Sequence, residues 1–449
     1  SRLYLSTPHS TTTSLSLFRS IYVYECDLPH IFTPGLVFYT KAIALSSFIG
    51  LDENYPNRKL STYIRKRCEG IMLRLHKKKA PARQVASAIT ATALALALPG
   101  VLTACSDSSA EPYGPGSTAK LKMADSYSIT HPVGKGGTQP FLDQVEKDQS
   151  VDIEYFSSGQ MGKQADIPSV LRSGVVDLAV ISPSYVSSSF PLSSVGDLPG
   201  FSSDACVTAY ALRDLVKPGG VLYKEELEPM KFMPLWTGSI PGYEAMTGGK
   251  DPSHPANFHG AVLRSTGGAL DRVIDEIDAA GVSMPIGDMY EAMSRGTVEG
   301  TLASPISITP YGLEDVIHAS TYGAQQGNFT FFYGINLDTW NRLNDQQKKV
   351  LTDAADKSQQ SVCKELNSAR EKSVQKMKDA GVQFYDVTKD QSAEEWQNIS
   401  QPVLDKWIEV AESKGHPAQQ VVDDFKAALK RHAHRAETKE ATEEGKEQP

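Results

Sequence analysis

The sequence lacks the short motifs of the common enzyme and metal-binding classes. It contains no His-Glu-x-x-His, no paired Cys-x-x-Cys, no Gly-x-Ser-x-Gly and no nucleotide-binding loop. The glycines at 134–137 lack the spacer and the Lys-Ser/Thr ending with which a phosphate loop holds a nucleotide. His432 and His434 fall in a charged tail, where solvated histidines are more common than metal ligands. We therefore expect no catalytic residue, no metal and no cofactor, in a protein that is not an enzyme.

Basic residues are scarce in most of the chain. The 449 residues include 45 Lys and Arg against 53 Asp and Glu. Residues 1–104 hold 13 of the basic and 5 of the acidic residues, which leaves 32 and 48, a net charge of −16, for the remainder. Nucleic-acid phosphates require basic patches, so this acidic body argues against a nucleic-acid partner. It also argues against charge-driven binding to anionic lipid.

Methionine is absent from residues 1–71, and a long apolar run lies beyond them. Met72 opens a basic segment, and residues 85–102 follow as an uncharged, alanine-rich run that Pro99-Gly100 interrupts. A basic head before an apolar stretch is typical of a secretory signal peptide, and 18 residues barely reach membrane-spanning length. The residues that follow, Leu102-Thr103-Ala104-Cys105, resemble the lipobox of bacterial lipoproteins, in which the cysteine is diacylated.

These N-terminal features predict how the chain is processed. We predict that residues 1–71 are not part of the mature protein and that residues 72–104 are a lipoprotein signal peptide. Upstream sequence read through from a misplaced start explains residues 1–71, and a genuine extra segment is the alternative. Residues 105–119 would be the lipidated Cys105 and a flexible Ser/Pro/Gly-rich tether. Two acyl chains would anchor the mature protein stably to the outer face of a bacterial cell membrane.

Cysteine is also scarce, with five residues in the chain. Removal of Cys26 and Cys68 and lipidation of Cys105 leave Cys206 and Cys363 in the folded body. Outside the cytoplasm these two could pair. They stand 157 positions apart and no spacing motif supports a bond, so the sequence leaves the disulfide open.

Strands and helices alternate through the body of the chain. Val151–Tyr155 alternates apolar and polar residues, as a half-buried strand does, and Leu178–Ile181 is a continuous apolar run typical of a strand buried on both faces. Helical spacing of apolar residues separates such segments, which indicates βαβ units and a largely parallel sheet. The Gly-Val-acid pattern of residues 172–177 recurs at residues 294–300, which favours two similar α/β halves.

Two long segments favour a connection between these halves. Thr330–Leu337 is a β-rich run long enough to cross from one half to the other. The helical stretch from the N-cap Asn344 to the C-cap Gly381 is long enough to brace both. A final helix is expected near residues 396–429. The predicted boundaries are 120–238 plus about 331–362 for lobe I, 239–330 plus about 363–430 for lobe II, and 431–449 for a disordered charged tail.

The stretch Phe258–Gly268 carries an unpaired cation at the end of a short predicted strand. Residues 261–263 form an apolar run bounded by glycines, and Arg264 follows them. A guanidinium at the end of a buried strand is costly unless an anion meets it. That anion is either a neighbouring carboxylate or a ligand, and the residues alone favour a salt bridge or a surface arginine.

A set of short segments follows in a characteristic order along residues 120–430. They are Ser158–Gly162, Leu171–Asp177, Gly260–Arg264, Asp288–Met293, Gly296–Gly300, Ile335-Asn336, Trp340 and the long helix. Each is common by itself, but their order and spacing resemble the substrate-binding proteins of tripartite ATP-independent periplasmic (TRAP) transporters. The resemblance implies an α/β, two-lobed periplasmic-binding-protein fold (type II-like), with a crossing strand and a long bracing helix, that closes on a small molecule.

The resemblance also implies a role for Arg264. This residue falls where the family places the arginine that grips a substrate carboxylate with two parallel charge-assisted bonds. The family often has a second arginine where this chain reads Tyr243-Glu244, and its Gln-Glu-Asn-Pro segment reads Leu302-Ala303-Ser304-Pro305. If Glu244 faces the cleft, a ligand that carries an amine or amide as well as a carboxylate is favoured. A solvent-exposed loop acid is the alternative.

Aromatic side chains and two loop residues complete the candidate pocket. Pockets are mostly apolar with a few placed polar groups. Tyr185 and His131 lie on loops after predicted strands, where α/β sheets bind ligands. The candidate walls are Trp236, Tyr243, Phe331 and Phe332, and an ordinary core role is the alternative for each.

The expected function is that of an extracytoplasmic solute-binding protein. It would capture a small organic anion between its lobes and deliver it to the small and large membrane subunits of a TRAP permease. The alternatives are a binding lipoprotein that serves a sensor or another transporter class, and a secreted enzyme with an unrecognised site.

Overall fold

The computed structural model describes residues 112–447. The predicted signal peptide, Cys105 and residues 1–71 lie outside the described residues. Within them, no helix has the length and apolar character needed to cross a membrane.

The first part of the fold is a five-stranded sheet in the order β2-β1-β3-β10-β4. Strands β1, β2 and β3 are parallel, and β10 runs antiparallel to both of its neighbours. All four residues of β3 are buried, as the continuous apolar run predicts. The strands are β1 (Ala119–Ala124), β2 (Val151–Phe156), β3 (Leu178–Ile181), β4 (Phe232–Ile240) and β10 (Phe329–Asn336).

The second part is a six-stranded sheet in the order β11-β9-β5-β8-β6-β7. β6 carries Arg264 and lies between β7 and β8, parallel to both. β5 is antiparallel to β8 and β9. The strands are β5 (Glu244–Thr247), β6 (Val262–Ser265), β7 (Ala280–Ser283), β8 (Gly300–Ala303), β9 (Ala319–Tyr322) and β11 (Gln383–Asp386).

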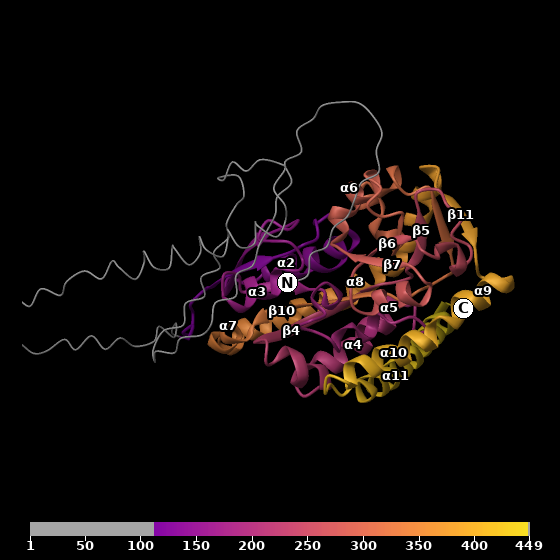
Figure 1. Ribbon diagram of the computed structural model, residues 1–449. Helices are drawn as coiled ribbons and strands as arrows, with labels where there is room; N and C mark the ends of the chain where they lie inside the picture. The colour runs from indigo at the N-terminus through magenta and orange to yellow at the C-terminus, as the bar shows by residue number, and fades with distance from the viewer. Residues whose placement is uncertain (1–111, 448–449) are drawn as a thin grey trace, which may run out of the picture. The chain divides into compact units, whose positions relative to one another are not determined.

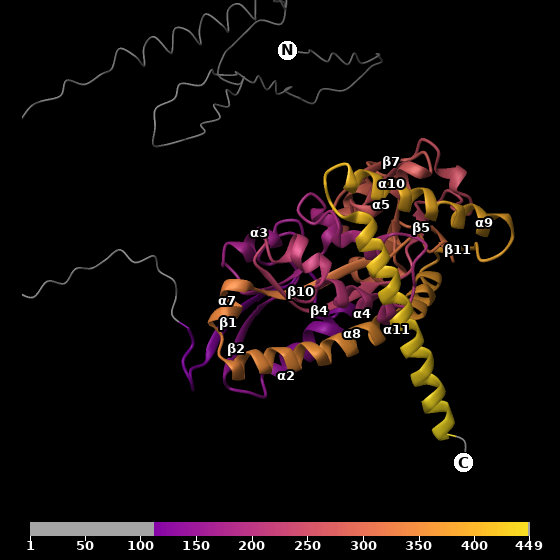
Figure 2. The ribbon, with the colours of Figure 1, turned by 90° about the horizontal axis from the view of Figure 1, so that it is seen from below.

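Helices flank both sheets, as Figures 1 and 2 show. They are α2 (Gln139–Val145), α3 (Ile167–Arg172), α4 (Ala205–Val216), α5 (Ala269–Glu276), α6 (Met289–Ser294), α7 (Leu337–Arg342), α8 (Asp345–Asp379), α9 (Asp390–Asn398), α10 (Ser400–Glu412) and α11 (Ala418–Glu447). Two mixed sheets with flanking helices confirm the predicted α/β class.

The long predicted helix is confirmed as α8. Asn344 accepts from the backbone N–H of Gln347 at 3.0 Å and Gln347 Oε1 accepts from the backbone N–H of Asn344 at 3.0 Å, which makes a complete capping box. Gly381, just beyond the helix, has φ +94°, a conformation that favours glycine. The helix packs Val362 and Leu366 into the main core and Met377 into a smaller core beside the six-stranded sheet. It therefore braces both sheets.

The connections between the sheets lie beside β10 and not within it. Residues 241–243 lead from β4 to β5, and residues 323–328 lead from β9 back to β10. These two connections pair with each other, because Tyr243 N–H donates to Gly327 O at 3.0 Å and Gln326 N–H donates to Tyr243 O at 2.8 Å. The predicted crossing strand, Thr330–Leu337, lies in the five-stranded sheet as far as Asn336, and Leu337 begins α7.

The C-terminal region differs from prediction in two ways. The single expected helix is divided into α9, α10 and α11, and α11 packs Phe425 against Phe201 (ring centroids 5.3 Å apart) beside α4 and the five-stranded sheet. The tail expected to be disordered continues α11 to Glu447, and Figure 2 shows this end extending away from the helices around it. Its residues are mainly Ala, Glu and Lys, strong helix formers, so the lack of large apolar residues did not imply a coil.

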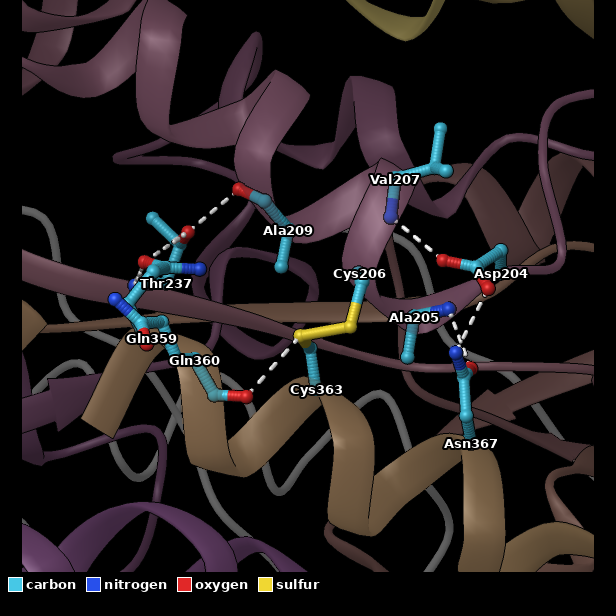
Figure 3. Close-up of a disulfide and its surroundings, with 10 residues drawn as sticks. All are labelled: Asp204, Ala205, Cys206, Val207, Ala209, Thr237, Gln359, Gln360, Cys363 and Asn367. Carbon is cyan, nitrogen blue, oxygen red and sulfur yellow. Dashed lines mark hydrogen bonds between the residues drawn. A yellow bond between two sulfur atoms is a disulfide. The ribbon is translucent and has the colours of Figure 1, made fainter. Parts of the chain in front are cut away.

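A disulfide joins Cys206 in α4 to Cys363 in α8. Around it, the N-terminus of α4 is attached to α8 by side chains: Asp204 caps Val207 N–H at 2.7 Å and accepts from Asn367 at 2.7 Å (Figure 3). The pairing that the sequence left open is therefore made in the structure.

Candidate ligand-binding site

Arg264 is a buried cation that has no counter-ion within residues 112–447. It is the third residue of β6 and none of its surface is exposed. Its Nε donates to the carbonyl oxygen of Met284 at 3.0 Å and its Nη2 donates to the hydroxyl of Tyr185 at 2.7 Å, both uncharged acceptors. Its Nη1 has no hydrogen-bond partner among residues 112–447. Because a buried charge normally pairs with an opposite charge, this arrangement indicates a site for an anion.

Tyr185 holds the guanidinium from the other sheet. It lies in the 3₁₀ turn Pro183–Val186, directly after β3, and its ring centroid is 5.9 Å from the Arg264 carbon Cζ. Its hydroxyl accepts from Arg264 and also from the backbone N–H of Ile286 at 3.2 Å. The two sheets therefore meet at Arg264 through a neutral, polarised hydroxyl.

Tyr243 lies beside the same guanidinium. It belongs to the connection between β4 and β5 and is nearly fully buried. Burial raises the pKa of Tyr243 well above its usual range, and the positive charge of Arg264, together with a weak hydrogen-bonding contact from its guanidinium, opposes that rise. The hydroxyl thus stays protonated and can donate a hydrogen bond to an anion held by Arg264.

A second group of polar side chains lies on the loop after β1. His131 and Tyr127 are both buried, and their ring centroids are 4.8 Å apart. Tyr311, from the six-stranded sheet's side, faces His131 at 6.0 Å. Burial raises the pKa of both Tyr127 and Tyr311, and the positive charge of Arg264 opposes the rise at Tyr311, so this group and Arg264 lie near each other.

The hydrogen bond to His131 fixes its tautomer. The backbone N–H of Val133 donates to His131 Nδ1 at 3.1 Å, so Nδ1 carries the lone pair. Burial lowers the pKa of His131 to about 3, so the ring is neutral at physiological pH. Its single proton is therefore on Nε2, a buried donor that has no partner within the described chain.

Phenylalanine rings complete the walls from β10. Phe331 contacts Tyr127 (centroids 5.8 Å apart) and Phe329 contacts Tyr185 (5.2 Å) and Tyr243 (6.4 Å). Residues two apart on a strand share one face, so Phe329 and Phe331 line the site together. Phe331 is pressed onto Gly238, where any Cβ would fall 2.1 Å from the ring, so glycine is required there.

The structure brings five of the predicted residues together and leaves others outside. Arg264, Tyr185, Tyr243, His131 and Phe331 form the site described above. By contrast, Trp236 stacks on Tyr333 in the core at 4.3 Å, as its alternative core role anticipated. Phe332 points to the opposite face of β10, against Phe190 and Phe232. Ser304 donates its hydroxyl to the carbonyl oxygen of Pro241 at 2.7 Å and so secures the connection between the sheets.

Glu244 is also occupied within the protein. It is fully buried, and its oxygens accept from Arg370 at 2.9 Å, from Thr321 at 2.8 Å and from the backbone N–H groups of Gly323 and Ala324. It is neither a loop acid in solvent nor an open acceptor, because its hydrogen-bonding capacity is used to join β5, β9 and α8. We therefore leave Glu244 out of the proposed site, and the suggestion of an amine or amide on the ligand loses its supporting residue.

Sequence reasoning missed Tyr127, Tyr311 and Phe329. Tyr127 follows β1 by three residues and Tyr311 follows β8, so both come from the carboxyl ends of strands, where ligands bind to α/β sheets. That rule selected His131 and Tyr185 from sequence. It missed Tyr127 because only His131 was chosen from the loop after β1. It missed Tyr311 because the strand expected after residues 294–300 was not followed into the loop beyond Pro305.

Comparisons with known proteins agree with this arrangement. The sequence profile described as bacterial extracellular solute-binding protein, family 7, matches residues 123–410. Two relatives are the ectoine-binding periplasmic protein TeaA of Halomonas elongata (24% identical; 65% of this chain and 85% of TeaA) and the C4-dicarboxylate-binding periplasmic protein DctP of Rhodobacter capsulatus (25%; 71% and 91%). These relatives are solute-binding proteins and not enzymes.

Solved structures share the fold at low sequence identity. A TRAP solute-binding protein of Rhodoferax ferrireducens with copurified benzoate superimposes with a TM-score of 0.65 and 18% identity, covering 71% of this chain and all of that one. A TRAP periplasmic solute-binding protein of Bordetella bronchiseptica with bound mandelate gives 0.62 and 20%, covering 70% and 99%. These matches confirm the two-lobed periplasmic-binding fold.

Proposed function

This chain belongs to the DctP family of TRAP solute-binding proteins, bacterial extracellular solute-binding protein family 7, and from that premise we propose that it captures a small organic carboxylate between its two sheets. It would then deliver that carboxylate to the small and large membrane subunits of a TRAP permease. The protein performs no covalent chemistry in this role. Its task is to bind a solute, enclose it and release it.

The unpaired guanidinium of Arg264 carries this proposal. All three of its nitrogens are buried, two are bound to neutral oxygens and the third has no partner within residues 112–447. A carboxylate at Nη1 would supply the missing charge and receive a charge-assisted hydrogen bond. Tyr243, protonated beside it, is positioned to donate a second bond.

The aromatic lining favours a ligand with a flat apolar body. The names of related proteins cover ectoine, C4-dicarboxylates, benzoate and mandelate, so family membership leaves the ligand open. Here Phe329 contacts Tyr185 beside Arg264, and Phe331, Tyr127 and Tyr311 lie around His131. Pockets of this composition bind the apolar part of a ligand, while the few polar groups set its orientation.

A thermal-shift titration of the purified protein with organic acids tests this function. Aromatic carboxylates should raise the melting temperature, because a ligand that binds only the native state stabilises it by mass action. Arg264→Gln should remain folded and bind the same acids about 100-fold more weakly, since a buried charged partner is lost. The matched control is Arg272→Gln, a surface arginine on α5 next to Asp275, which should bind like the wild type. Undiminished carboxylate binding by Arg264→Gln would refute the role of this residue.

We further propose that Cys105 is lipidated and anchors the protein on the outer face of the cell membrane. The support is the signal-like segment 72–104 that ends in Leu-Thr-Ala before Cys105. Cys105→Ser should move the protein from the membrane fraction to the soluble fraction, and unchanged retention in the membrane would count against lipidation.

A further inference from the structure

Arg264 accounts for one end of the site, and a separate set of polar atoms lies at the other. His131 Nε2 is buried and has no hydrogen-bond partner among residues 112–447. The hydroxyls of Tyr127 and Ser182 are also buried and lie close enough for Ser182 to act on the pKa of Tyr127, but they form no hydrogen bond of ordinary geometry. Buried polar atoms are almost always hydrogen-bonded, so an unpartnered N–H beside two hydroxyls that satisfy each other only weakly calls for an explanation. Neither the family's carboxylate clamp nor the packing of the sheets uses them.

These atoms offer hydrogen bonds without charge. His131 presents a fixed N–H donor, because Val133 occupies its other nitrogen. Tyr127 and Ser182 carry hydroxyls, which can donate and accept. Burial keeps Tyr127 protonated by raising its pKa well above the usual range. A ligand beside these residues would therefore meet one N–H that can only donate, on His131, and two hydroxyls that can donate or accept, on Tyr127 and Ser182.

The charged groups nearby are already bound. Asp125 accepts from Thr138 at 2.7 Å, from Tyr333 at 3.0 Å and from the backbone N–H of Tyr127 at 2.9 Å. Asp197 accepts from Ser184 and from the hydroxyl and backbone N–H of Thr330. Neither of these two carboxyl groups is therefore open to a ligand ammonium.

A second ligand carboxylate would also lack a partner. His131 is neutral, and the charge of Arg370, the other largely buried arginine in the vicinity of the connections, is neutralised by Glu244, although its Nε has no hydrogen-bond partner among the described residues. Burying a second anion beside neutral donors alone is costly. The polar group that fits this end of the site is uncharged.

We propose that Tyr127, His131 and Ser182 form a second subsite that hydrogen-bonds an uncharged hydroxyl or carbonyl oxygen of the ligand. The ligand class is then an aromatic monocarboxylate that carries a hydroxyl or oxo group away from its carboxylate. This inference rests on the proposed function, since Arg264 must hold the carboxylate for the second group to reach this subsite.

The test is a calorimetric titration of the purified protein with acids that differ in one substituent. The probes are benzoate and its hydroxy, aminomethyl and carboxy derivatives, each in the meta and para isomer. The better hydroxy isomer should bind about tenfold more tightly than benzoate, the factor expected for one added neutral hydrogen bond. The aminomethyl and carboxy derivatives should bind at least tenfold more weakly than the hydroxy acid.

Two variants assign the preference to the subsite. Tyr127→Phe keeps the ring and removes the hydroxyl. His131→Asn keeps an acceptor for Val133 N–H through its amide oxygen and removes the Nε2–H donor. Each should lower the ratio of hydroxy-acid affinity to benzoate affinity from about tenfold toward one, whatever its effect on benzoate binding itself, and a cooperative thermal unfolding transition shows that the variant is folded.

The possible outcomes distinguish a failure of the second subsite from a failure of the proposed carboxylate-binding function. Equal affinity for benzoate and both hydroxy acids, tightest binding of a charged derivative, or a hydroxyl preference that survives in both variants would overturn the second subsite while carboxylate binding stands. If no acid binds, or if Arg264→Gln binds all of them like the wild type, the proposed function fails as well.

Discussion

Arg264 connects the residue chemistry of this protein to its function. A buried guanidinium without a counter-ion would be a serious cost in an ordinary core. Here a carbonyl oxygen, a tyrosine hydroxyl and the Tyr185 ring stabilise it in part, and one nitrogen remains for a ligand. This partial stabilisation of the guanidinium suits a binding protein, because an arginine already paired with a carboxylate of the protein would bind a ligand carboxylate more weakly.

Buried carboxyl groups next to the site give the protein a specific pH dependence. Burial raises the pKa of Asp197 to about 7 from its usual value of 3.8. Asp197 is therefore protonated in the folded protein at pH values where it is ionised in the unfolded chain. The folded state binds more protons, so the contribution of Asp197 is fully present below about pH 4 and is lost as pH rises toward 7.

Asp197→Asn should flatten this dependence. The amide keeps an acceptor for Thr330 and offers a donor to Ser184, the bonding of a protonated carboxyl. Relative to the wild type, the variant should gain unfolding free energy between pH 5 and pH 8, as measured by urea denaturation. Glu226 and Asp125 also have raised pKa values, and they contribute equally to the pH dependence of the unfolding free energy in the wild type and the variant. The surface variant Asp424→Asn is the control, and a parallel pH profile for Asp197→Asn would contradict the account.

At the scale of elements, α8 organises the fold. Its beginning and end could be predicted from Asn344, Gln347 and Gly381, because capping is local chemistry. The elements that pack against α8 could not be predicted in this way, because Cys363 in α8 meets Cys206 only once α4 lies beside α8. The strands β5, β7 and β9 were not predicted either, because these four-residue segments show neither a period nor the apolar run that marks β3 and β6.

The disulfide between α4 and α8 should contribute measurably to stability. It closes a segment with a sequence separation of 157 residues, and cross-links of long segments typically stabilise a protein by about 2 to 4 kcal/mol. The Cys206→Ser, Cys363→Ser double variant should therefore unfold at lower urea concentration than the oxidised wild type. A reductant should lower the wild type to the level of the variant and leave the variant unchanged. Equal stability of oxidised wild type and variant would show that the bond is absent or without effect.

At the scale of the whole described chain, the site exists because two sheets present the ends of their strands to each other. Tyr185 follows β3 and Arg264 lies near the end of β6, and they bond directly. Gly267 supports this approach: it has φ +92°, and a Cβ there would fall 2.6 Å from the carbonyl oxygen of Ser184. Lys163 and Asp288 form a further exposed ion pair across the same junction, at 3.0 Å.

Because residues from two sheets form the site, only part of it could be predicted from the sequence. The α/β class, the long helix and the importance of Arg264 follow from local patterns and from the family resemblance. Which aromatic rings face Arg264 depends on how the two sheets meet, so Trp236 and Glu244 were chosen and Tyr127 and Tyr311 were not. Sequence spacing places residues on a strand, whereas the packing of one sheet against another decides which of them share a site.

The central claim is that a carboxylate binds Arg264 between the two sheets, and a crystal structure of the complex with the most stabilising aromatic acid tests it most directly. The expected result is a carboxylate oxygen about 2.7 to 2.9 Å from Arg264 Nη1, with the ring between Phe331 and Tyr311. Binding at another place, such as the surface hollow that Asp214, Lys217 and Arg431 line between α4 and α11, with Nη1 still unpaired, would contradict the account.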